Sequence, residues 1–368
     1  MTQIVQHKLV QISILLLVAL TTAVVSPATV RGALVMPDSY ISEPKTRDLN
    51  THPLQRIPNS WYLSGIPYQK QWENNCGPVT TNMVLGFYGI RLSQAYTANK
   101  LRPRRDDVSV SGLEMVNFSK MEYGLQGDVG YSGSLRTIEA LISNNIPVIV
   151  LQPFKIGSDI NHFRVVSGYN RTSRTFVIQD SILGKDLIWT YDYFLNLWKQ
   201  RGRIYIAIYP PSKAKIVKQI RNSYDLPRKR LQLSELDMAQ KAVRQAPQDP
   251  WVWLNLGREL YYSERYKDSY AAWNKALSLG LPRRALWYMP WPVYLLNELG
   301  LHEQAISLAN QALQTIHASS ELYYGRAIAY EAIGNNQAAL RDLRTALAYA
   351  PYHPYYRQAL REFMRRYR

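Results

Sequence analysis

The segment IPYQKQWENNCGPVTTNMVLGFYGI, residues 66–90, decides the fold of the first half of the chain. It contains the only cysteine, Cys76, which is followed by Gly77, Pro78 and apolar residues at helical spacing. This pattern predicts a helix that begins at Cys76. A thiol at a helix N-terminus lies near the positive end of the helix dipole and near unpaired backbone N–H groups, which favour the thiolate. We therefore interpret Cys76 as a nucleophile; the alternative is a buried packing residue.

A thiolate nucleophile needs a general base, and elimination selects His162. The other five histidines fall in the N-terminal segments or in the C-terminal half. His162 opens the strand-like run HFRVVSGY, which turns at NRTS and returns as RTFVIQD. A hairpin centred near Arg171 places His162 opposite Asp180 to within one residue. Directly opposed side chains lie about 4.5 to 5.5 Å apart, so the carboxylate would orient the imidazole.

An oxyanion donor is also expected upstream of the nucleophile. Gln71 lies five residues before Cys76, and its side-chain amide would act together with the Cys76 backbone N–H on a tetrahedral intermediate. Gln69 is the alternative donor. No pair of His or Cys residues in this half has metal-ligand spacing, and we expect neither metal nor cofactor.

Three segments, PYQKQWENNCGP, HFRVVSGYN and FVIQDS, resemble the motif blocks of the bacteriocin-processing, double-glycine-leader type of papain-like cysteine peptidase. The resemblance covers about residues 61 to 210. It implies a nucleophile helix packed on an antiparallel sheet, with Cys76 as nucleophile, His162 as general base and acid, Asp180 as orienting residue and Gln71 as oxyanion donor. In many family members the glutamine lies six residues before the cysteine rather than five. The leader-processing members are also fused to a transporter, which this chain does not resemble, so bacteriocin maturation is not implied.

The C-terminal half contains a helical repeat. Alanines recur at 34, 36 and 34 residues, the tetratricopeptide period; they are Ala242, Ala276, Ala312 and Ala346. The segment VWLNLGRELYYSERYKDSYAAWNKALSLGLP closely resembles a tetratricopeptide repeat. The next copy departs from the pattern through Pro290 and Pro292, which predicts a kinked or shortened first helix. Such arrays bind other proteins, and a protein partner is expected here.

The N-terminus predicts export. An apolar run from about Leu9 to Val25 follows Lys8, and small residues follow at Ala28 or Ala33. The segment is a cleaved signal peptide or a retained membrane anchor, so the mature chain would be periplasmic or extracellular. A single cysteine excludes an intramolecular disulfide. The net charge of +17 alone does not indicate nucleic acid, because no nucleic-acid-reading motif accompanies it.

These patterns predict an α+β papain-like domain followed by an all-α repeat solenoid. The expected boundaries are a signal or anchor at 1–33, an extended lead-in at 34–60, a peptidase domain at 61–211, a basic linker at 212–230 and repeats at 231–368. The predicted function is an exported cysteine peptidase acting on a peptide or protein. The alternatives are an amidase or acyl transferase on cell-wall peptides, which would use the same residues, and a non-catalytic scaffold that binds peptide.

Overall fold

The computed structural model describes residues 57–367, except 105, 108, 157, 159, 283, 284 and 317. The predicted signal or anchor and most of the lead-in therefore lie outside the described residues. In the part of the chain that is described, no helix combines the length and apolarity needed to cross a bilayer.

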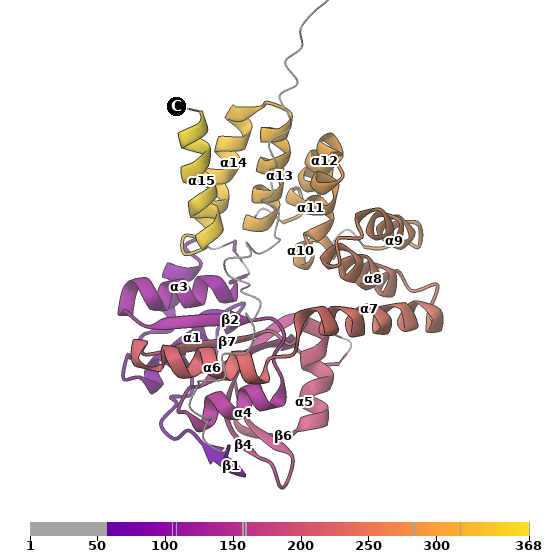
Figure 1. Cartoon of the computed structure of the whole chain (residues 1–368). Helices are drawn as coiled ribbons and strands as arrows, with labels where there is room; N and C mark the ends of the chain where they lie inside the picture. Colours follow the sequence, from indigo (N-terminus) through magenta and orange to yellow (C-terminus); the bar gives the residue numbers. More distant parts are fainter. Residues whose placement is uncertain are drawn as a thin grey trace, which may run out of the picture. The chain divides into compact units, whose positions relative to one another are not determined.

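The first domain is built on one antiparallel sheet (Figure 1). Six strands run in the order β2-β7-β3-β4-β5-β6, and β1 pairs with β4. Their bounds are β1 Ser60–Tyr62, β2 Gln126–Gly130, β3 Val148–Pro153, β4 Asn161–Asn170, β5 Thr175–Asp180, β6 Gly184–Thr190 and β7 Tyr205–Tyr209. The helices are α1 Cys76–Phe87, α2 Gln94–Leu101, α3 Gly112–Tyr123, α4 Leu135–Ser143, α5 Tyr191–Trp198 and α6 Ala214–Tyr224.

The two faces of the sheet bury different sets of helices. On β4, Phe163 and Val165 belong to the apolar cluster that contains residues of α1, α2 and α3. Val166 belongs to the cluster that contains residues of α4, α5 and α6. This division follows from the alternation of side chains along a strand. By the same alternation, His162 and Arg164 share a face with Val166.

Helix α6 lies within the segment that we predict to be a basic linker. Its Val217 and Ile220 are completely buried in the apolar cluster of α4 and α5. Arg221 pairs with Asp128 of β2. The predicted boundary at residue 211 thus falls before the last helix of the sheet domain.

The C-terminal half consists of helices only. They are α7 Arg228–Gln245, α8 Pro250–Tyr262, α9 Tyr266–Ser278, α10 Ala285–Tyr288, α11 Trp291–Glu298, α12 His302–Leu313, α13 Ser320–Ala332, α14 Asn336–Tyr349 and α15 Pro354–Arg366. Neighbours pack in pairs, α8 on α9, α11 on α12 and α13 on α14 (Figure 1). The periodic alanines of α9, α12 and α14 are at most 1% exposed, because close helix crossings leave no room for a larger side chain. The irregular middle repeat begins with two short helices, α10 and α11, as its prolines predict.

Gly257 provides a test of this packing. A Cβ at this position would lie 2.7 Å from the Trp291 ring and 3.4 Å from the Ser269 carbonyl oxygen. We expect Gly257→Ala to lower the free energy of unfolding by about 1 to 3 kcal/mol, measured by chemical denaturation. The smaller ring of Trp291→Phe should reduce that cost in the double variant. Equal costs in both backgrounds would contradict the contact.

Candidate functional site

Cys76 lies at the first residue of α1, as predicted. Asn75, the residue before the helix, is 1% exposed and its side chain is held at both ends. Its amide donates to Gln94 at 2.7 Å, and its carbonyl oxygen accepts from Arg102 at 2.9 Å. Gly77 is buried, and a Cβ there would press on Met115 and Val110 at 3.0 and 3.1 Å. Close packing of α1 against α3 therefore explains this glycine.

The Cys76 thiol and the His162 imidazole shift each other's pKa. Burial raises the pKa of Cys76, but the hydrogen bond to His162, the imidazolium charge and the backbone N–H groups of Phe163 and Gly77 outweigh it, so the net pKa is lowered. Burial lowers the pKa of His162, yet its hydrogen bonds to Asp180 and Cys76 raise the net value. Opposite shifts in two contacting groups favour a thiolate–imidazolium pair.

Asp180 orients the imidazole. Its Oδ1 lies 3.1 Å from His162 Nε2 and accepts backbone N–H bonds from Ile182 and Leu183 at 2.8 and 2.9 Å. Because Nε2 is occupied by the carboxylate, Nδ1 is the ring nitrogen that remains for the thiol. Burial raises the pKa of Asp180, but these bonds and the charges of His162 and Arg164 hold it far below its ordinary value. The carboxylate is therefore ionised across the neutral range.

The register of the hairpin differs from the predicted one. Asn170 pairs with Thr175, and a bulge between Val166 and Gly168 shifts the ladder by one residue. Continuing this ladder beyond Val165 sets Arg164, rather than His162, opposite Asp180. The hairpin prediction was thus wrong by two residues. Because a two-residue shift keeps a side chain on the same face, His162 still reaches the carboxylate diagonally.

Arg164 is the residue that the sequence reasoning missed. It is fully buried, and its Nε donates to Asp180 Oδ2 at 2.7 Å. Its remaining N–H groups donate to the carbonyl oxygens of Pro153 and Phe154 and to Gln152 Oε1, and its guanidinium lies 4.9 Å from the Trp189 ring. The signal was present in HFRVVSGY, since a charged residue in an otherwise apolar strand needs a buried partner.

The structure also separates the two candidate oxyanion donors. The Gln71 side-chain carbonyl accepts from Ser181 at 2.6 Å, and its backbone N–H donates to the Ser181 carbonyl at 3.0 Å. Gln71 is therefore tethered to the residue after Asp180, and its amide nitrogen has no acceptor among the described residues. Gln69 instead donates to Leu92 and accepts from Asn82. Both ends of the Gln69 carboxamide are therefore hydrogen-bonded within the protein.

An antiparallel sheet with a cysteine helix on one face and a His–Asp pair at the strand ends defines a domain of the papain-like cysteine peptidase class. Residues 63–206 match the model of the Peptidase_C39 like family. The predicted fold class and the predicted resemblance, a papain-like peptidase domain followed by tetratricopeptide-like repeats, are confirmed. No curated protein matches the chain. No group of three or more His, Cys, Asp or Glu residues in the described part of the chain is arranged to hold a metal ion.

Solved structures resemble each half of the chain. A putative C39-like peptidase from Bacillus anthracis is 16% identical and covers 41% of this chain and 98% of its own, with a TM-score of 0.35. The peptidase domain of Streptococcus ComA is 20% identical. The match covers 39% of this chain and 98% of the ComA domain, with a TM-score of 0.32. YrrB, described as a TPR protein with an unusual peptide-binding site, is 16% identical. The match covers 40% of this chain and 88% of YrrB, with a TM-score of 0.20.

Proposed function

We propose that this chain is an exported cysteine peptidase that cleaves peptide bonds through an acyl-enzyme intermediate on Cys76. The observations that carry the proposal are the position of Cys76 at the first residue of α1, the 3.1 Å contact between His162 and Asp180, and the opposite pKa shifts of Cys76 and His162. Export rests on the sequence pattern of residues 1–33, and partner binding on the repeats.

The residues would act in the following order. The Cys76 thiolate attacks the scissile carbonyl carbon, and the oxyanion accepts hydrogen bonds from the Gln71 amide and the Cys76 backbone N–H. The His162 imidazolium gives its proton to the leaving amine, which departs and leaves a thioester. His162 then takes a proton from water, whose oxygen attacks the thioester, and the acid product and the thiolate are released. Asp180 stays ionised and keeps the imidazole oriented.

The surroundings of the site favour peptide segments with apolar side chains. Trp72, Ile160, Ile182 and Leu183 are between 45 and 60% exposed, and each lies within three residues of Gln71, His162 or Asp180 in sequence. Exposed apolar side chains close in sequence to the site residues are suited to bind apolar substrate residues. Neighbouring subsites that accept Leu, Phe or Val are therefore proposed.

Product analysis tests the proposal. The full chain and its Cys76→Ala variant are incubated with a peptide library derived from a digested proteome, and new termini are identified by mass spectrometry. We expect cleavage within apolar segments that falls more than about a thousandfold in Cys76→Ala. New amide or ester products without peptide hydrolysis would indicate an acyl transferase, and identical product sets for both proteins would indicate a non-catalytic scaffold.

Gln71→Ala separates the oxyanion donor from the nucleophile. We expect kcat on a cleaved peptide to fall by about 10² to 10³, because the charge on the tetrahedral oxygen loses one donor. Alkylation of Cys76 by iodoacetamide should keep its rate, since that reaction forms no oxyanion. Gln69→Ala is the matched control, and we expect it to leave kcat near the unsubstituted value. A loss of kcat in Gln69→Ala alone would reverse the donor assignment.

A further inference from the structure

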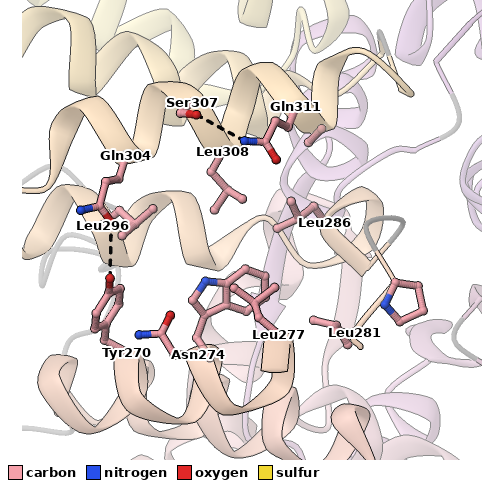
Figure 2. A pocket seen from close by; sticks show the side chains of 13 residues that line it. Tyr270, Asn274, Leu277, Leu281, Leu286, Leu296, Gln304, Ser307, Leu308 and Gln311 are labelled. Carbon is pink, nitrogen blue, oxygen red and sulfur yellow. Dashed lines mark hydrogen bonds between the residues drawn. The ribbon is translucent and has the colours of Figure 1, made fainter. Parts of the chain in front are cut away.

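The repeat domain contains a cavity of about 440 Å³ between α9 and α12 (Figure 2). Its volume falls within the range of pockets that hold small ligands or a few peptide residues. Figure 2 shows Asn274 of α9 and Leu308 of α12 extending into the space from opposite sides, with Leu286 and Leu296 between them. The cavity is part of the repeats and contains none of the residues of the candidate catalytic site.

The cavity follows from the irregular middle repeat. Its first helix consists of α10, four residues long, and α11, eight residues long, whereas α8 and α13 each have 13 residues. Pro290 and Pro292 prevent one continuous helix. Fewer side chains consequently fill the gap between α9 and α12, and apolar residues such as Leu286 and Leu296 line it.

Among the residues that the structure describes, the lining combines apolar side chains with carboxamides and includes no charged residue. Gln304 accepts a hydrogen bond from Tyr270 at 3.4 Å through its oxygen, which leaves its amide N–H groups for a ligand. Gln311 donates to Ser307 at 3.3 Å, which leaves its carbonyl oxygen for a ligand. One free donor and one free acceptor match the carbonyl and N–H groups of a peptide backbone.

The spacing of these two carboxamides fits an extended chain. Gln304 and Gln311 are seven residues apart on α12, which corresponds to roughly 10 Å along the helix axis. An extended peptide rises about 3.3 Å per residue, so roughly three residues span the same length. A side chain in the middle of such a segment would reach the apolar lining near Leu308.

We propose that this cavity binds an extended, uncharged peptide segment with a central aliphatic side chain, through Gln304 and Gln311 to its backbone and the leucines to its side chain. Charged segments are disfavoured because none of the described lining residues would compensate a desolvated charge. The site goes beyond the proposed peptidase function and does not require Cys76 to be active.

The test uses the full-length Cys76→Ala chain, so that no probe is cleaved. Acetylated and amidated heptapeptides Ser-Gly-Ser-X-Ser-Gly-Ser, with X as Leu, Asp or Lys, are titrated by saturation-transfer NMR. We expect the Leu peptide to bind at least about tenfold more tightly than the other two. Gln304→Ala with Gln311→Ala should weaken it about tenfold, and Ser307→Trp, at an exposed position on the cavity lining, should abolish binding by filling the space.

Gln337→Ala is the matched control, because Gln337 is an exposed residue on α14 outside the cavity. Binding that survives both Ser307→Trp and the double glutamine variant lies elsewhere on the chain and overturns the proposal. Equal affinity for acetyl-leucine amide and the Leu peptide shows a pocket for a small apolar molecule and also overturns it. Absence of saturation by the Leu peptide up to about 1 mM has the same consequence.

Discussion

Replacing His162 by alanine is expected to slow the alkylation of Cys76 at pH 6 by roughly tenfold to a hundredfold. The burial of the thiol is the largest influence on its pKa and raises it, and the imidazole is the main group that opposes this effect. Without the imidazole the pKa should rise to the free-thiol value of about 8.5 or above, which leaves little thiolate at pH 6. The alkylation rate should fall by a smaller factor than the thiolate fraction does, because a thiolate of higher pKa is more nucleophilic.

The measurement is the rate of iodoacetamide labelling of Cys76 between pH 4 and 10, followed by mass spectrometry. The intact chain should label well below pH 8, and the acid-shifted component should disappear in His162→Ala. His302→Ala, in the repeats, is the control and should keep the profile of the intact chain. A labelling profile centred near pH 8.5 that is the same in the intact chain and in His162→Ala would exclude an activated thiolate.

The direction of each pKa shift also predicts the pH dependence of hydrolysis. The lowered pKa of Cys76 means that thiolate is present at lower pH than for a free thiol. The raised pKa of His162 means that the imidazolium, which protonates the leaving amine, persists further toward alkaline pH. The hydrolysis rate should therefore give a bell-shaped curve against pH. Both limbs of the curve report the coupled titration of Cys76 and His162. Alkylation, which needs no proton donor, should lack the alkaline decline.

The second large effect concerns stability. Arg164→Leu leaves the Asp180 carboxylate buried without the cation that it contacts at 2.7 Å. Because an uncompensated buried charge costs far more than the pair contributes, we expect a loss of about 3 to 5 kcal/mol in the free energy of unfolding. The double variant Arg164→Leu with Asp180→Leu should recover part of that loss. Chemical denaturation followed by circular dichroism measures both.

The matched control for Arg164→Leu is Arg174→Leu on the same hairpin. Arg174 and Asp192 form an ion pair in which the side chains are 61 and 83% exposed, so its loss should cost no more than about 1 kcal/mol. Arg164 also has a testable effect on the site, because its charge helps to hold the pKa of Asp180 low. In Arg164→Leu the acid limb of Cys76 alkylation should change, whereas Arg174→Leu should leave it unchanged. Equal stabilities of the two variants would contradict the buried pair.

Local patterns were sufficient for the parts of the protein that depend on near neighbours. The helix that starts at Cys76 is encoded by a few consecutive residues. The same holds for the repeat period, where Ala276, Ala312 and Ala346 occupy equivalent crossings. The runs that form β3, β4, β5 and β7 were also identified, whereas β1, β2 and β6 were not. Both β2 and β6 contain Gly and Asp and therefore give little apolar periodicity.

The sequence by itself determined which side chains within β4 share a face, because a strand alternates with a period of two residues. Only the tertiary structure decided the register of β4 against β5, because a bulge between Val166 and Gly168 shifts the ladder by one residue. It likewise decided that Arg164 is the partner of Asp180, that α6 completes the sheet domain and that the shortened α11 leaves a cavity. Each of these depends on residues far apart in the chain, whose contacts no local pattern encodes.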